Sequence, residues 1–283
     1  MADADTEFVG YDLGHGETAL GRAYGRSMRE PEILEFRGEK SFVTAVAKTR
    51  DGIKIGAEAV NIAAMGKSPD VWVKFKGRDL SDPSIKAPTT IFTKTLMSAL
   101  ASDKKIQGPK SSRFIVGCPS GWSLGERADY QEVFEESGLK TVRIVPESRA
   151  ALMTALEQGY LSLDAARSSV LIVDIGSSTT DFTYCRDLEA EDVGHNILGS
   201  GLLDTEIFDL NLARQKEKAK IDKLIKRYPH YRPIMEYWCR LAKEQYFNGE
   251  GAPVEMIKRL PIGSGVYFEI RIDKEDARKI LGT

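Results

Sequence analysis

Residues 171–176, Leu-Ile-Val-Asp-Ile-Gly, repeat the pattern of residues 8–14, Phe-Val-Gly-Tyr-Asp-Leu-Gly. Each copy is an apolar run followed by an aspartate, an aliphatic residue and a glycine, and residues with small or hydroxyl side chains come next. Such an apolar run predicts a buried strand, and the glycine lets the backbone turn sharply and approach an anion closely. Successive backbone N–H groups in a turn of this kind form a nest for phosphate oxygens. The sequence therefore predicts two phosphate loops, each directly behind a buried strand.

The aspartates around these loops are candidate metal-binding residues. Mg²⁺ keeps several of its water molecules and is usually shared between one or two carboxylates and substrate phosphates. Asp12 and Asp174 stand at the ends of the two predicted strands, and Asp181 follows the second loop. A single Asp-x-Gly tripeptide is also an ordinary turn, but two copies behind two strands favour the functional interpretation. We therefore expect Asp12, Asp174 and Asp181 on the metal side, holding Mg²⁺ through water.

The composition sets the class of protein. A chain of 283 residues is long enough for two lobes of ordinary domain size, with 42% hydrophobic and 29% charged residues. The net charge of −2 gives no overall field for nucleic acid or an acidic membrane surface, so we expect neither as a partner. No apolar stretch approaches the roughly 18 residues of a membrane helix, and a cytoplasmic location is the default expectation. The three cysteines form no CxxC pair, which favours buried apolar roles.

The rest of the chain alternates between strand and helix patterns, which favours a layered α/β architecture. Strands are predicted over 8–13, 18–24, 43–46, 53–55, 113–119, 142–145 and 170–173, with two more within 254–272. Helices are predicted over 91–101, 126–137, 148–158, from 203 through a basic stretch to the prolines at 229 and 233, and over 234–247 and 274–281.

Four segments resemble the actin, Hsp70 and sugar-kinase superfamily, and most of all the Hsp70 ATPase domain. DIGSSTTD at 174–181 is similar to the second phosphate motif of that family, DLGGGTFD. VPESRAAL at 145–152 is similar to its NEPTAAAL segment, which puts Glu147 where the family keeps a water-orienting carboxylate. LGSGLLD at 198–204 resembles LGGEDFD, and CRLAK at 239–243 resembles the helix beside the adenosine. The likeness extends over nearly the whole chain.

The resemblance implies an α/β fold of duplicated, ribonuclease H-like lobes around a nucleotide cleft. The first lobe, 1–146, would carry phosphate loop 1, and the second, 147–283, would carry loop 2 and a helical and strand subdomain at about 204–283. The implied catalytic residues are Glu147, Asp12, Asp174 and Lys74. The implied contacts to ATP or ADP are Gly14, His15, Gly16, Gly176, Ser177, Ser178, Thr179, Gly199, Ser200, Gly201 and Lys243.

Several positions depart from the family pattern. In the first loop His15 and Gly16 replace paired threonines, so DLGHGET is closer to the DxGxGxT form of some prokaryotic actin-like proteins. The catalytic lysine should fall within 73–78, where Lys74 and Lys76 both fit. Arg240 stands where a glutamate is usual, and no GGxxxxP adenosine motif follows the helix at 274–281. We therefore expect an incomplete second lobe.

Each of these candidate residues could also have an ordinary structural role. A carboxylate such as Glu147 at a helix start is favoured by the helix dipole alone. Lys74 and Lys76 could belong to a solvated, charged loop. His15 is expected to be a turn residue beside phosphate rather than a general base, because the sequence supplies no partner for it.

The favoured function is an Hsp70-like ATPase core that binds Mg²⁺ and ATP and hydrolyses ATP slowly. Lobe movement would be coupled to a co-chaperone-like or regulatory protein partner. The alternatives are a prokaryotic actin-like filament protein, a small-molecule kinase, for which no substrate base is evident, and a non-catalytic nucleotide-binding module or fragment. We expect no peptide-binding domain within these 283 residues.

Overall fold

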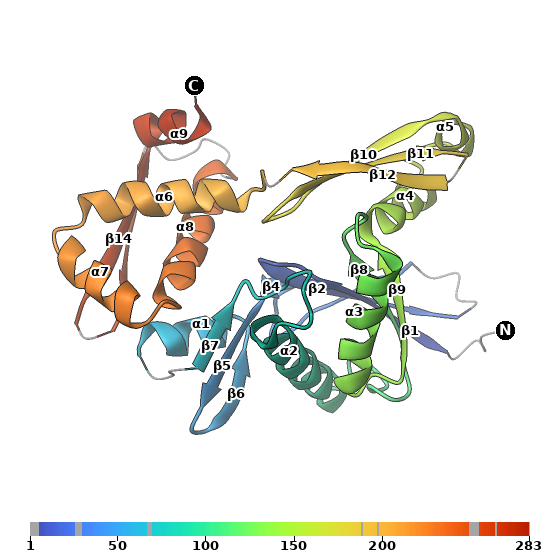
Figure 1. Ribbon diagram of the computed structural model, residues 1–283, viewed down its shortest axis with the longest axis horizontal. Coiled ribbons are helices and arrows are strands. Elements are labelled where there is room, and N and C mark those ends of the chain that lie inside the picture. The colour runs from blue at the N-terminus through green and yellow to red at the C-terminus, as the bar shows by residue number, and fades with distance from the viewer. Residues whose placement is uncertain are drawn as a thin grey trace. The chain divides into compact units, whose positions relative to one another are not determined.

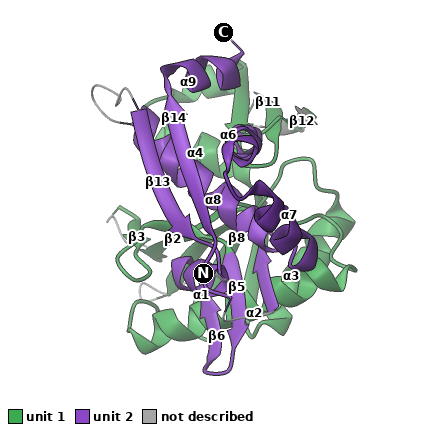
Figure 2. Cartoon of the chain, turned by 90° about the vertical axis from the view of Figure 1, so that its left-hand side faces the viewer, with its two compact units in different colours: residues 1–44, 75–199 green, residues 45–74, 200–283 purple. Residues whose placement is uncertain are grey.

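A computed structural model describes residues 6–25, 30–66, 70–187, 189–196, 198–248, 255–263 and 265–282 (Figure 1). The chain has a mixed α/β architecture, as the sequence predicts. It divides into two compact units, which we call unit 1 (1–44 and 75–199) and unit 2 (45–74 and 200–283) (Figure 2). The boundaries of these units differ from the boundary expected between lobes at 1–146 and 147–283. The lobe boundary stays a prediction.

The main sheet of unit 1 places two of the candidate carboxylates at one edge. Its strand order is β3-β2-β1-β8-β9, and β4 also pairs with β2. The strands are β1 (Glu7–Leu13), β2 (Glu17–Tyr24), β3 (Glu32–Leu34), β4 (Ser41–Val43), β8 (Arg113–Cys118) and β9 (Thr141–Pro146). Since β1, β8 and β9 run parallel, their carboxyl ends meet at the same edge. Asp12, near the end of β1, and Glu147, directly after β9, both lie there.

Two helices of unit 1, α2 (Pro83–Ser102) and α3 (Leu124–Glu136), pack against each other, and α3 packs against β9. Helix α2 begins eight residues before the predicted start at 91. The Asp82 side chain accepts a bond from the Ser84 N–H, and Pro83 occupies the first helical position, where its missing N–H costs nothing. Tyr11 of β1 bonds Thr93 of α2 through their hydroxyls at 3.2 Å. This buried bond ties the strand of the first loop to α2.

The second sheet of unit 1 is antiparallel and packed on one face. It consists of β10 (Val170–Ile175), β11 (Thr180–Arg186) and β12 (Glu189–Asn196), in that order. The helices α4 (Glu147–Glu157) and α5 (Leu163–Ser168) contribute Leu152 and Ala166 to a small core on that face. The prediction of a strand at 170–173 is confirmed. The expectation that this strand is buried is wrong for one of its two faces. Leu171, Val173 and Ile175 lie on the face opposite the small core and are exposed.

Unit 2 combines a small sheet with a helical part. The sheet order is β6-β5-β7, from β5 (Ala45–Thr49), β6 (Gly52–Ile55) and β7 (Asp70–Val73), with α1 (Ala57–Ala64) packed on it. The other elements are α6 (Gly201–Arg214), α7 (Lys218–Arg227), α8 (Tyr231–Phe247), β13 (Glu255–Pro261), β14 (Tyr267–Asp273) and α9 (Lys274–Leu281). Helices α6 and α8 pack on each other and on β14, and α1 packs on α8.

The long basic helix predicted from 203 onward is two helices, α6 and α7, so that prediction is wrong. Gln215 leaves the helical conformation, with φ −63° and ψ 131°. Its side-chain amide donates to the Glu269 carbonyl at 2.7 Å and accepts from the Glu269 N–H at 3.1 Å. This pairing with the edge of β14 ends α6. Pro233 breaks no helix, because it lies in the first turn of α8, where proline is tolerated.

Candidate functional site

The first phosphate loop is a tight turn between β1 and β2. The Gly14 N–H donates to the Glu17 carbonyl at 2.8 Å, and a Cβ at Gly14 would lie 2.4 Å from that oxygen, so only glycine fits. Thr44 holds the turn from the other side: its hydroxyl donates to the Gly14 carbonyl at 2.8 Å and its N–H to the Gly16 carbonyl at 3.0 Å. The backbone of this loop is therefore fixed before any ligand binds. Sequence reasoning did not identify Thr44, which follows a short strand and belongs to no motif.

The second loop repeats the first in three dimensions. The Gly176 N–H donates to the Thr179 carbonyl at 2.8 Å, as Gly14 does to the residue three positions on, and the loop joins the antiparallel strands β10 and β11. The register is the same too, because Asp12 lies opposite Ala19 and Asp174 lies opposite Asp181. The sequence repeat thus corresponds to two hairpins of one design.

Loop 2 has contacts of its own, to Asp181 and to Gly199. The Thr179 hydroxyl donates to an Asp181 carboxylate oxygen at 2.9 Å, which orients that carboxylate. A Cβ at Gly199 would lie 2.6 Å from the Ser177 carbonyl oxygen and 2.6 Å from the Ser178 carbonyl carbon. The backbone at Gly199 therefore lies directly against the 177–178 backbone, and these two predicted nucleotide segments are in contact within unit 1.

A lysine and a glutamate form an ion pair at the carboxyl edge of the main sheet. The Lys76 ammonium lies 3.0 Å from Glu147 Oε1, and the Lys76 side chain is only 9% exposed. Glu147 is the first residue of α4. Gly117 makes room for it, because a Cβ there would lie 3.1 Å from Glu147 Cγ. The sequence did not distinguish Lys74 from Lys76 as the catalytic lysine. In the structure it is Lys76 that pairs with Glu147.

The pKa values of Asp12 and Asp174 are both raised, first by burial and then by the charges of neighbouring carboxylates. Burial by surrounding protein raises the pKa of Asp12 to about 6, with a contribution from the charge of Glu147, opposition from Lys76 and a further rise from Asp174. The pKa of Asp174 is also raised, first by burial and then by Glu147 and Asp181. A bound cation would relieve the repulsion between these carboxylates, which Lys76 opposes only in part. Among the described residues no group of three or more histidine, cysteine, aspartate or glutamate side chains is arranged to hold a metal ion, and the expected role of Asp12, Asp174 and Asp181 stays a prediction.

These charges predict a pH-dependent stability in the absence of Mg²⁺ and nucleotide. Since the pKa of Asp12 rises from 3.8 in the unfolded chain to about 6 in the fold, its contribution is fully present below pH 4 and is lost as the pH rises through 6. A full shift would correspond to about 3 kcal/mol, and because Asp12 keeps contact with solvent we expect about 1 kcal/mol. Asp12→Asn should therefore raise the free energy of unfolding by about 1 kcal/mol at pH 7.5 and not at pH 4.

Chemical denaturation at the two pH values measures this difference. Asp129→Asn, at an exposed position of α3, is the control for removing a carboxylate outside the cluster and should not show the stability gain at pH 7.5. A stability gain of Asp12→Asn that is as large at pH 4 as at pH 7.5 would contradict the assigned charge repulsion.

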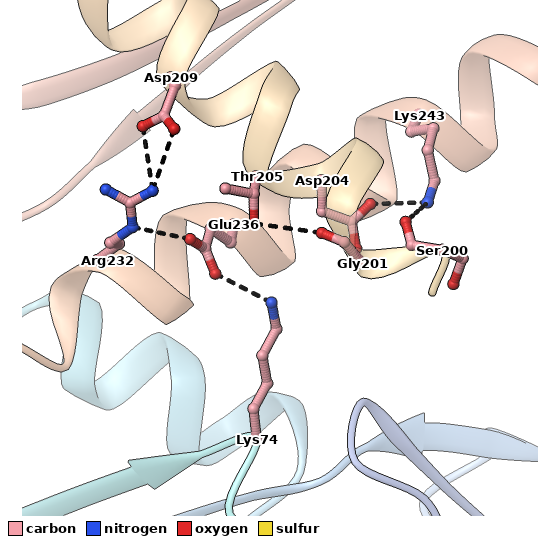
Figure 3. A network of polar contacts seen from close by, with 9 residues as sticks. All are labelled: Lys74, Ser200, Gly201, Asp204, Thr205, Asp209, Arg232, Glu236 and Lys243. Carbon is pink, nitrogen blue, oxygen red and sulfur yellow. Dashed lines mark hydrogen bonds and ion pairs between the residues drawn. The ribbon is translucent and has the colours of Figure 1, made fainter. Parts of the chain in front are cut away.

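Unit 2 contains a separate polar network (Figure 3). The Lys243 ammonium lies 2.7 Å from Asp204 Oδ1 and 3.2 Å from the Ser200 carbonyl oxygen. Asp204 is 1% exposed, and burial raises its pKa against the opposing effect of Lys243. The predicted residues Ser200, Gly201 and Lys243 are thus brought together at the start of α6, with the Thr205 hydroxyl donating to the Gly201 carbonyl. Sequence reasoning did not select Asp204 as a site residue, although it ends the LGSGLLD motif.

Lys74 belongs to this second network. Its ammonium lies 3.0 Å from Glu236 Oε2 on α8 (Figure 3). Arg232 donates to the other Glu236 oxygen at 2.9 Å and to Asp209 at 3.1 and 3.2 Å. Lys74 has a backbone φ of +56°, in the left-handed region that non-glycine residues rarely adopt. Lys74 and Lys76 thus pair with different glutamates, Glu236 in unit 2 and Glu147 in unit 1.

The chain is similar in sequence to the Hsp70-type chaperone DnaK. It is 26% identical to the chaperone protein DnaK of Mycoplasmopsis synoviae over 251 aligned residues, which cover 76% of this chain and 40% of that protein. It is 25% identical to the chaperone protein DnaK of Elusimicrobium minutum over 232 residues, covering 76% of this chain and 36% of that protein. The chain thus spans about two fifths of the length of these relatives.

These similarities support an Hsp70-like relationship, as the motifs of the two loops predict. No protein-family model matches the chain. Among the helices of the described residues, none has the length and apolar character needed to cross a membrane.

Proposed function

We propose that this chain is an Hsp70-like nucleotide-binding core that binds Mg²⁺ and ATP at the two loops of unit 1 and hydrolyses ATP slowly. The observation that carries the proposal is the pair of matched hairpin loops, each with an aspartate two residues before its glycine. The similarity to DnaK chaperones supports this choice over an actin-like filament protein. A co-chaperone-like or regulatory partner is part of the proposal, as is a cytoplasmic location.

In this mechanism the two loops bind the phosphates of ATP, and side chains at the carboxyl edge of the main sheet of unit 1 catalyse hydrolysis. Backbone N–H groups of 14–16 and 176–179 bind phosphate oxygens, and their preformed turns need little reorganisation. Asp12 and Asp174, with Asp181 oriented by Thr179, would hold Mg²⁺ through water. When bound, Mg²⁺ supplies charge neutralisation at the phosphates. The role of Lys243 beside the adenosine stays a prediction from the resemblance.

Glu147 and Lys76 have complementary roles in the proposed hydrolysis. Glu147 accepts a hydrogen bond from the attacking water and orients it toward the terminal phosphate. Lys76 neutralises charge that develops on the phosphate oxygens, and its ion pair with Glu147 sets where the ammonium lies. We propose Lys76 in place of Lys74 because Lys74 is held by Glu236 in unit 2.

Calorimetric titration of the chain with ATP, with and without Mg²⁺, tests the proposal. We expect Mg²⁺-dependent binding that Asp174→Ala reduces by at least about tenfold, since it removes one of few ligands to a shared cation. Asp129→Ala, on the exposed face of α3, is the control and should bind like the parent chain. Absence of ATP binding by the parent chain would overturn the proposed function, and equal binding by Asp174→Ala would remove loop 2 from the site.

A further inference from the structure

We propose that His15 is a positioning residue, whose imidazole holds the segment carrying Lys76 and thereby fixes the Lys76 ammonium on Glu147. The inference rests on the proposed function of this site. His15 is one of the two positions in loop 1 that lack the paired threonines of the resembling family, and the sequence offers no partner for it. The structure supplies one in the Lys76 carbonyl, 61 positions further along the chain.

The hydrogen bond fixes the protonation of the ring. His15 Nδ1 lies 2.8 Å from the Lys76 carbonyl oxygen. Because a carbonyl oxygen can only accept, Nδ1 must carry the hydrogen, in either the neutral Nδ1–H tautomer or the imidazolium. The bond therefore requires a hydrogen on Nδ1, and the position of the hydrogen on the ring can be measured.

The two sides of this hydrogen bond differ in rigidity. His15 stands on the turn that Gly14, Thr44 and Glu17 hold in place. Lys76, in contrast, lies beyond the end of β7, where residues 74–76 belong to no strand or helix and have no sheet partner to align them. Phe75, buried against Phe92, anchors the segment one residue earlier, and the His15 bond then fixes the Lys76 carbonyl relative to loop 1.

Packing limits the alternatives for this segment. A Cβ at Gly77 would lie 2.5 Å from Ile85 Cδ1, so the backbone after Lys76 already lies close to α2. With the backbone held by His15 and by this contact, the Lys76 side chain reaches Glu147 at 3.0 Å. Displacing a catalytic group by 1 Å can cost about a hundredfold in rate. Loss of the imidazole should therefore lower turnover more than it lowers nucleotide affinity.

Three substitutions separate this role from a phosphate contact. The amide nitrogen of asparagine is two bonds from Cβ, as is Nδ1 of histidine, whereas that of glutamine is three bonds away, as is Nε2. We expect His15→Asn to keep kcat within about threefold of the parent, and His15→Ala and His15→Gln to lower it at least tenfold, with ATP affinity changed less than kcat. Unchanged turnover in His15→Ala, or rescue by glutamine and not by asparagine, would overturn the inference.

Nuclear magnetic resonance gives a readout that needs no turnover. In the ¹⁵N-labelled chain we expect the His15 ring to carry a hydrogen on Nδ1, and the Lys76 ammonium signal to move in His15→Ala and not in His15→Asn. The Nε2–H tautomer would overturn the inference whether or not ATP is hydrolysed. The expected signals in a chain that does not hydrolyse ATP would leave the positioning of Lys76 in place and would refute the proposed ATPase function. Thermal unfolding of each variant checks that it is folded.

Discussion

Lys76→Met should lower ATP turnover by about a hundredfold or more, whereas Lys74→Met should leave turnover within about threefold of the parent. A preorganised donor aimed at developing charge is typically worth a factor of 10²–10³ in kcat. The Lys76 side chain is only 9% exposed, and its methionine replacement keeps most of the apolar stem while removing the charge. Steady-state hydrolysis at saturating Mg²⁺ and ATP measures the two variants under the same conditions.

Lys74→Met is the matched control, because it removes a lysine two positions away that also pairs with a glutamate. Its expected effect is on stability: Glu236 keeps Arg232 as its remaining partner, so we expect a loss of about 1–2 kcal/mol in the free energy of unfolding. If Lys74→Met loses turnover as severely as Lys76→Met while remaining folded, the assignment of Lys76 is refuted.

The second large effect is expected for Gly199→Ala, which should weaken ATP binding at least tenfold. The new methyl group would lie 2.6 Å from the Ser177 carbonyl oxygen, so the backbone of loop 2 must move. Overpacking of this kind costs about 1–3 kcal/mol, and here the displaced atoms belong to the proposed phosphate loop itself. Calorimetric titration with Mg²⁺ and ATP, together with chemical denaturation, separates the binding loss from the stability loss.

Gly125→Ala provides the control for Gly199→Ala. Gly125 lies in the first turn of α3, and its nearest neighbouring atom would be Ser123 Oγ at 3.9 Å from the new Cβ. We expect unchanged ATP binding and a small gain in stability from the helix propensity of alanine, at most about 1 kcal/mol. Normal ATP affinity in Gly199→Ala would show that the contact between 199 and 177–178 has no part in nucleotide binding.

The sequence by itself determined the elements whose causes are local. An apolar run followed by Asp-x-Gly specifies a strand and a tight turn, so both hairpin loops could be located from residues alone. The helix predicted over 274–281 is confirmed, and its ends have local causes, because Asp273 caps it and Gly282 ends it in the left-handed conformation. Glu147 could be placed at a helix start for the same reason, since Pro146 ends the preceding strand.

Only the tertiary structure decided which side chains share partners. The alternation of a strand would put Lys74 and Lys76 on one side, but Lys74 has a left-handed backbone and pairs with Glu236, whereas Lys76 pairs with Glu147. The break between α6 and α7 depends on the bond of Gln215 to a strand more than 50 positions away. The partner of His15 and the raised pKa of Asp12 likewise depend on groups distant in sequence. Local patterns fix dihedral angles and caps, whereas charge pairing and burial depend on contacts that only the folded chain creates.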